Sequence, residues 1–483
     1  MSLKQEAVSG VGWSTISKFG EEVIRAIVMI VLARLLTPDA FGLIGMIMVF
    51  SGFVNVFRDA GFGPALIQTK ELTDIQISSV FWVTVGLGMF LTVLLIGASP
   101  LIAYFYDNPA LTSLTMGIAF NFLIQGFAIV QRSLFKRDMD FKGLAIVKVT
   151  AALVGGAVAV IMAYFDFGVW SLVGRRLVSS FGLVGALWAI SDWKPSFSFS
   201  WVSVKELLGF SGNLTGFNVF NYWVRKVDDL LVGRFLGSGA LGLYTRAYSV
   251  MLFPLQRVSR VVGKVMFPAL TKIQDDIERT KRVYLKSLSL IALITFPLML
   301  GLLVTTEHLV LAVLGSQWEG IIILLRLLSI VGMSQSIGTT TGWIYQAQGR
   351  TDWMFRWGIF SGIIAIVSYV IGLRWGLIGI TVTITIRHVP MTYLNFAIPG
   401  RLIDMTFTDV ARSVSGVFSC SAVMAGVVWV IGMVVPEGFS HWAYLGIQVP
   451  AGVILYLLLV YVFKLQPYKE FIRILNEQWE RKR

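Results

Sequence analysis

Residues 77–104 read ISSVFWVTVGLGMFLTVLLIGASPLIAY, a run of 28 positions that contains no charged side chain. A helix crosses the hydrocarbon core of a bilayer with about 20 apolar residues, so this stretch is long enough to span it. The whole chain has the same character, because 56% of its 483 residues are hydrophobic and only 14% are charged. Soluble proteins carry about 25% charged residues. The sequence therefore predicts an all-α polytopic membrane protein.

Windows of similar length and hydropathy predict about fourteen transmembrane helices. Their expected spans are 9–34, 40–57, 77–104, 110–131, 144–164, 167–190, 207–233, 240–257, 287–306, 320–347, 357–373, 376–399, 413–435 and 442–463. With this count, 28 Lys and Arg residues, including Arg58, Arg132 and Lys148, fall on one side of the membrane. Such an excess marks the cytoplasmic side. Both termini are therefore expected in the cytoplasm.

The sequence lacks the residues that several chemical functions would need. Cys420 is the only cysteine, which excludes disulfides and cysteine-based metal sites. His308, His388 and His441 are too far apart in sequence to form a spaced ligand motif, and the sequence contains neither a phosphate-binding loop nor a zinc-protease motif. The net charge of +13 is attributed to a basic cytoplasmic rim rather than to nucleic-acid binding. No catalytic residue, metal or cofactor is expected.

An internal repeat organises the chain. Residues 31–43, VLARLLTPDAFGL, recur 200 positions later as residues 231–243, LVGRFLGSGALGL. The identical pairs are Arg34/Arg234, Ala40/Ala240, Gly42/Gly242 and Leu43/Leu243, and Arg25 falls on Arg225 at the same offset. A common register of this kind indicates duplication.

The repeat predicts two pseudo-symmetric six-helix lobes around a central cavity. The expected domains are 1–193 for the first lobe, 194–400 for the second, and 401–483 for two added helices and a basic tail. Each copy has an even number of helices, so both enter the membrane in the same direction. Transporters that alternate access between two lobes use such repeats.

The two repeated corners and residues 266–276, MFPALTKIQDD, resemble Wzx-type polysaccharide flippases of the MOP superfamily. Within it, the sequence is most similar to the colanic-acid and teichuronic-acid exporter branch. The resemblance covers almost the whole chain. It implies transport of polyprenyl-pyrophosphate-linked oligosaccharides from the inner to the outer leaflet of a bacterial cytoplasmic (inner) membrane. It also implies contact with membrane lipids, and a polysaccharide polymerase and assembly proteins as further partners of a monomeric protein.

Charged residues inside the expected spans mark the candidate site. Each costs about 2.5–3.5 kcal/mol at the bilayer centre, so they are expected to face a wet cavity or one another. The cations are Lys18, Arg25, Arg175, Arg176, Arg225, Lys226, Arg246, Arg326 and Arg387. The acids are Glu21, Glu22, Asp228 and Asp229. The excess of positive charge predicts a cationic, substrate-binding cavity.

Spacing places several of these charges on one helix face. Lys18, Glu21, Glu22 and Arg25 follow the i, i+3, i+4, i+7 pattern of a single stripe. The equivalent stripe in the second copy reads Asn218, Asn221, Tyr222 and Arg225, and continues to Asp229. Two interpretations of the acids stay open. They pair with cations four residues away, or they exchange H⁺ or Na⁺ to couple transport to an ion gradient.

Arginine dominates the cations and fits phosphate with a planar pair of donors. A cationic cavity favours a pyrophosphate headgroup or acidic sugars as the cargo. Arg34, Arg234 and Arg374 fall on the side opposite the basic loops, where they are expected at the outer mouth or as interface anchors.

Three alternatives to this function remain. A cation-coupled drug exporter of the same superfamily would need an acidic cavity. A membrane glycosyltransferase or polymerase would need catalytic groups near a large outer loop, and the longest expected outer loop covers only residues 307–319. A flippase for the peptidoglycan precursor would differ only in its lipid-linked substrate. A transporter rather than an enzyme is therefore expected.

Overall fold

A computed structural model describes residues 3–58, 61–69, 71–208, 222, 223, 225–436, 438–470, 472 and 473. These residues are almost entirely helical, and no strand occurs among them. The chain divides into two compact units, Met1–Gly242 and Leu243–Arg483. The expected boundaries at 193/194 and 400/401 stay predictions.

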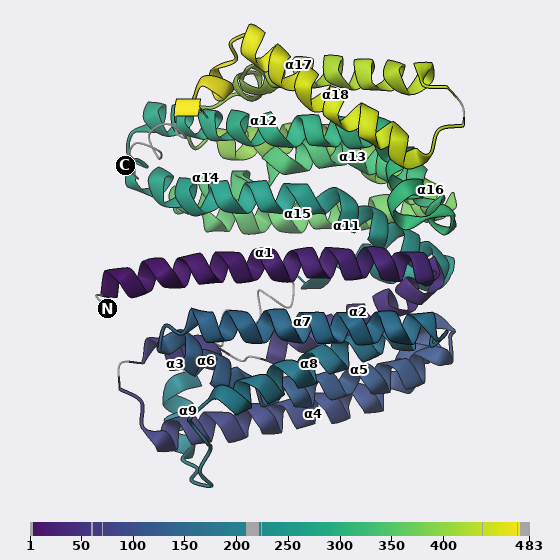
Figure 1. The fold of residues 1–483 in the computed structure, drawn as a ribbon. Helices are drawn as coiled ribbons and strands as arrows, with labels where there is room; N and C mark the ends of the chain where they lie inside the picture. The colour runs from purple at the N-terminus through teal and green to yellow at the C-terminus, as the bar shows by residue number, and fades with distance from the viewer. Residues whose placement is uncertain are drawn as a thin grey trace. The chain divides into compact units, whose positions relative to one another are not determined.

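The described part of unit 1 contains nine helices and the beginning of a further one. They are α1 (Leu3–Leu35), α2 (Pro38–Arg58), α3 (Phe62–Gln68), α4 (Asp74–Tyr106), α5 (Ala110–Gly126), α6 (Ile129–Arg137), α7 (Phe141–Tyr164), α8 (Trp170–Ile190), α9 (Trp201–Leu208) and the first part of α11 (Val227–Lys272). The long helices α4, α5, α7 and α8 lie side by side, and α1 packs on α7 (Figure 1).

Close backbone contact joins α4 to α5. A Cβ atom on Gly88 would lie 2.7 Å from the carbonyl oxygen of Phe122, so only glycine fits. Beside it, the Thr92 hydroxyl donates to the Ala119 carbonyl at 3.0 Å. Small residues and hydroxyls allow such close helix packing within a membrane.

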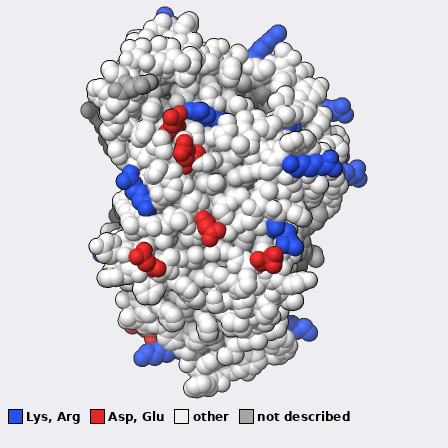
Figure 2. All heavy atoms as spheres, turned by 90° about the vertical axis from the view of Figure 1, so that its right-hand side faces the viewer, with Lys and Arg blue, Asp and Glu red and all other residues white. Residues whose placement is uncertain are grey.

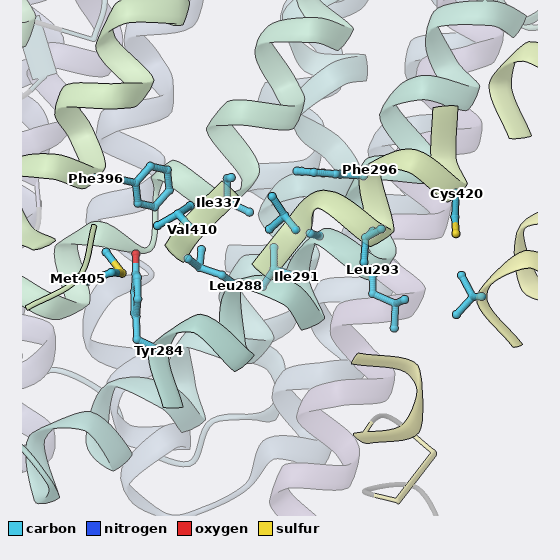
Figure 3. Close-up of a cluster of buried hydrophobic side chains, with 14 of the residues drawn as sticks. Tyr284, Leu288, Ile291, Leu293, Phe296, Ile337, Phe396, Met405, Val410 and Cys420 are labelled. Atoms are coloured by element: carbon cyan, nitrogen blue, oxygen red, sulfur yellow. The ribbon is translucent and has the colours of Figure 1, made fainter. Parts of the chain in front are cut away.

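Unit 2 continues with α11, and its described residues form seven further α-helices. They are α12 (Ile277–Leu309), α13 (Ile321–Gly338), α14 (Thr341–Ala347), α15 (Thr351–Leu373), α16 (Gly376–Gly400), α17 (Phe407–Val434) and α18 (His441–Val462). The helices α17 and α18 pack on α12 (Figure 1). Their shared core includes Leu288, Phe296, Val410 and Cys420 (Figure 3).

Among the described residues, ten helical segments are long and apolar enough to cross a membrane, or eleven if the bent pair α5–α6 forms one span. They coincide with eleven of the expected spans, so the chain is a multi-pass membrane protein. The other three spans lack this support. Span 9–34 lies in α1 but carries the charged stripe, 240–257 lies in α11, and most of 207–233 falls on residues 209–221 and 224, outside the described part of the chain.

The two repeated corners pack against each other within unit 1. A Cβ on Gly42 would lie 1.7 Å from the carbonyl oxygen of Ser238, and one on Gly242 would lie 1.9 Å from that of Pro38. Gly237 has φ +84°, a left-handed conformation that favours glycine, and interrupts α11 there. The repeated glycines therefore serve close backbone contact.

Candidate functional site: a cationic cavity in unit 1

Unit 1 contains a cavity of about 620 Å³ between α1, α2, α5, α6, α7 and α8. Six cationic side chains line it, against a single carboxylate, Glu21, among the described residues. The formal excess is five positive charges. The cations are Arg25, Arg58, Arg132, Lys148, Arg175 and Arg176. Low-dielectric walls strengthen the field of such a cluster, so the cavity attracts anions.

Arg175 and Arg176 lie on the α8 wall of the cavity. Their nearest polar partners are sulfur atoms, since Arg175 Nη1 donates to the Met29 thioether at 3.3 Å and Arg176 Nη1 to that of Met48 at 3.2 Å. A thioether is a weak acceptor without charge. Among the described residues, no carboxylate forms an ion pair with either guanidinium, and the cationic Arg25 lines the same cavity.

Glu21 and Arg25 form an ion pair across one turn of α1, with a separation of 2.5 Å between Oε1 and Nη2. Arg25 remains largely exposed, with 61% of its side-chain surface accessible. An exposed pair of this kind contributes about 0–1 kcal/mol to stability. The pair is therefore weak enough for a second anion to compete for Arg25.

The residues expected near the start of α11 show local pairing. Lys226 Nζ and Asp229 Oδ2 lie 2.6 Å apart, and the backbone N–H of Asp229 donates to Asp228 Oδ1 at 2.9 Å. Arg225 is exposed and precedes the helix, while Lys18 is exposed on α1. None of these five residues lines the cavity. Asn218 and Asn221 lie outside the described residues.

The expected cations of unit 2 have different surroundings. Arg326 Nη2 donates to Glu307 Oε2 at 3.0 Å, from α13 to α12. Arg246 lies over the ring of Trp318, 5.7 Å from its centroid. Arg387 on α16 has a buried Nε without a hydrogen-bond partner among the described residues.

Two of the residues expected at the outer mouth are exposed at helix ends, Arg34 on α1 and Arg374 after α15. Arg234 lies 5.9 Å from the ring centroid of Phe105. These positions agree with either expected role, so both roles stay predictions.

Sequence reasoning assigned three cavity cations, Arg58, Arg132 and Lys148, to the cytoplasmic rim. They lie near or beyond the ends of the expected spans, where hydropathy alone does not distinguish a rim from a cavity wall. A signal that could have located the cavity wall is the pair of polar residues on an otherwise apolar helix. Asn121 and Gln125 share one face of α5, and both line the cavity.

Two histidines far apart in sequence meet in unit 2. His308 Nδ1 and His441 Nδ1 lie 3.1 Å apart, and the ring of His308 stacks on Tyr444 with centroids 4.1 Å apart. Within the described chain, no group of three or more His, Cys, Asp or Glu side chains is arranged to hold a metal ion.

Several known proteins are similar to this chain in sequence or in fold. Residues 31–323 match the model of a family described as "Polysaccharide biosynthesis protein". The chain is 30% identical to the lipopolysaccharide biosynthesis protein WzxC of Escherichia coli over 82% of this chain and 81% of that protein. It is 28% identical to the teichuronic acid biosynthesis protein TuaB of Bacillus subtilis over 95% and 96%.

Solved structures give the same fold class at lower identity. The lipid II flippase MurJ in an inward closed conformation aligns with a TM-score of 0.73 and 17% identity over 95% of this chain and 99% of that chain. An inward-facing MATE transporter of the MOP superfamily aligns with a TM-score of 0.60 and 13% identity over 80% and 94%. These likenesses establish the fold.

The fold is that of a multi-pass, helical membrane protein with a cationic cavity in unit 1. The chain belongs to the polysaccharide biosynthesis protein family, whose model covers more than half of its length. The resemblance found from the repeated corners is confirmed.

Proposed function

We propose that this protein is a flippase for a polyprenyl-pyrophosphate-linked oligosaccharide, moving it from the cytoplasmic to the outer leaflet by alternating access. The names of WzxC and TuaB, which refer to polysaccharide biosynthesis, and the lipid II flippase with the same fold support this class of cargo. The hydrocarbon tail stays in lipid while the headgroup crosses through the protein.

The observation that carries the proposal is the excess of five positive charges in the unit 1 cavity. A pyrophosphate link is anionic at neutral pH, and arginine binds phosphate oxygens with paired donors. A drug exporter that carries organic cations would meet repulsion from the same residues. The cationic cavity therefore favours the lipid-linked glycan over the cationic drug.

The proposal includes the bacterial inner membrane, fourteen spans and cytoplasmic termini. Figure 2 shows one face on which Lys, Arg, Asp and Glu side chains are scattered among mostly uncharged residues. Cations expected outside the cavity serve as secondary contacts along the path. They are Lys18, Arg225, Lys226, Arg246, Arg326 and Arg387.

Ion coupling is the second part of the proposal. Glu21 lines the cavity and forms an ion pair with Arg25. It is therefore the acid best placed to lose its partner and take up a cation when an anion binds. Glu22, Asp228 and Asp229 keep the alternative role of ion pairing. A polymerase and assembly proteins are proposed partners on the outer side.

Reconstituted flipping tests the function. Arg25→Ala in proteoliposomes with undecaprenyl-pyrophosphate-linked oligosaccharide is expected to reduce the flipping rate about 10-fold or more, because one charge-assisted contact is lost. Arg25→Lys should retain part of the rate. Arg356→Ala, which removes an exposed cation of α15, is the matched control. Wild-type protein that fails to move this substrate would refute the function.

A further inference from the structure

A chain of hydrogen bonds crosses the cavity wall from α6 through α5 to α8 and back. The Arg132 guanidinium donates to Gln125 Oε1, and Gln125 Nε2 donates to Ser180 Oγ at 2.8 Å. Ser180 Oγ in turn donates to Asn121 Oδ1 at 2.7 Å. All four residues line the cavity. The last three are at least nine-tenths buried.

The chain has one direction. Arg132 only donates, Gln125 accepts with its oxygen and donates with its nitrogen, and Ser180 gives its single proton to Asn121. The carbonyl oxygen of the Asn121 side chain is therefore occupied. Among the described residues, no hydrogen bond is found for the amide nitrogen of Asn121, and the residue lines the cavity. Its N–H groups are therefore available to a group that enters the cavity.

Hydrogen bonds in series polarise one another, by about 10–30% per bond. Here the first donor is a guanidinium, which keeps its positive charge at any physiological pH. Polarisation along the chain strengthens the N–H groups of Asn121 as donors. Because Ser180 occupies the amide oxygen, Asn121 presents donors to the cavity and favours an oxygen that carries no proton.

We propose that Arg132, Gln125 and Ser180 form a positioning relay that makes Asn121 an oriented donor to an anionic oxygen of the cargo. This inference rests on the proposed function. The surrounding arginines attract an anion by charge, which acts over a distance and in many orientations. The relay adds direction, since a hydrogen bond weakens steeply when it is bent. A phosphate and a sugar carboxylate both offer such an oxygen.

Binding to purified full-length protein tests the relay. The probes are undecaprenyl pyrophosphate, which has phosphates and no sugar, and glucuronate, which has a carboxylate and no phosphate. Ser180→Ala interrupts the relay while Asn121 and Arg132 remain. It is expected to weaken binding of at least one probe about threefold to tenfold. The probe that is affected identifies the source of the oxygen.

A double-mutant cycle separates the relay from a merely structural role. In the Asn121→Ala background, Ser180→Ala should have no further effect on affinity, because the side-chain amide that Ser180 orients is absent. Ser171→Ala is the matched control, since Ser171 is a buried serine on the same helix that does not line the cavity. Thermal unfolding of each variant identifies loss of the fold.

Two results would overturn the relay. The first is that Ser180→Ala binds both probes with the affinity of wild type. The second is that the effects of Ser180→Ala and Asn121→Ala on affinity are independent and multiply. The proposed function fails separately, if wild-type protein binds neither probe.

Discussion

The cavity of unit 1 and an apolar groove of unit 2 differ in how their polar groups are paired. The groove has a volume of about 470 Å³ between α12, α17 and α18, and no charged side chain lines it among the described residues. In the cavity, the guanidinium groups of Arg175 and Arg176 donate to neutral thioethers. In the groove, the hydroxyls of Thr305 and Tyr456 donate to backbone carbonyls.

Tyr456 shows how the groove achieves this. Pro297 lacks the N–H that would otherwise bond to the Leu293 carbonyl in the next turn of α12. The Tyr456 hydroxyl donates to that carbonyl at 2.7 Å. A binding surface for an anion keeps its donors unpaired, whereas a surface for hydrocarbon has to pair them, because unpaired groups are costly where water is absent.

Reversing the charge of the cavity is expected to have the largest effect. Arg175→Glu combined with Arg176→Glu should reduce flipping at least about 100-fold, because two charge-assisted contacts become repulsive. The measurement is the initial flipping rate in proteoliposomes at equal protein content. A double variant with more than half of the wild-type rate would mean that the cargo does not pass these residues.

A new carboxylate should distinguish the two regions by stability. Val453→Glu places a charge in the groove and should lower the free energy of unfolding by about 2.5–3.5 kcal/mol. Ala152→Glu places the same group among the cavity cations and should leave stability near that of wild type. Thermal unfolding in one detergent compares them. Equal losses would show that the cavity does not compensate a carboxylate.

Removing one hydroxyl from the groove tests the role of Tyr456. Tyr456→Phe leaves the Leu293 carbonyl buried without its partner, at an expected cost of about 1–3 kcal/mol in unfolding free energy. Tyr461→Phe, at an exposed position of α18, is the control. Indistinguishable unfolding of both variants would contradict the assigned pairing.

The smallest effect is expected from Glu21→Gln. Without the carboxylate, Arg25 loses its ion-pair partner and is free for an anion, so binding of undecaprenyl pyrophosphate should tighten about twofold to fivefold. Isothermal titration on the purified protein provides the measurement. Weaker binding would instead assign Glu21 a direct role in holding the cargo.

Much of the fold follows from local sequence. The uncharged run 77–104 predicts α4, because a span depends on about 20 consecutive residues. The span expected at 9–34 corresponds to α1, but α1 is not among the helices apolar enough to cross a membrane, because it carries the charged stripe from Lys18 to Arg25. The repeat at Gly42 and Gly242 was visible in the sequence, but the contact of its two copies was not.

The candidate site was predictable only in part. Arg25, Arg175 and Arg176 were expected in a cavity because a membrane helix rarely carries unpaired charge. The partner of Arg326 was not predictable from helix spacing, since Glu307 lies on a different helix. The same limit applies to the relay, in which each bond joins residues 7, 55 or 59 positions apart.

Composition, hydropathy and the 200-residue repeat determined by themselves that the chain is a duplicated membrane protein with surplus positive charge. Tertiary structure decided which cations share a cavity, which are neutralised across helices and which amide stays open. The reason is physical. Partition into lipid is a property of each segment, whereas the compensation of a charge or a hydrogen bond depends on atoms that folding brings within about 3 Å.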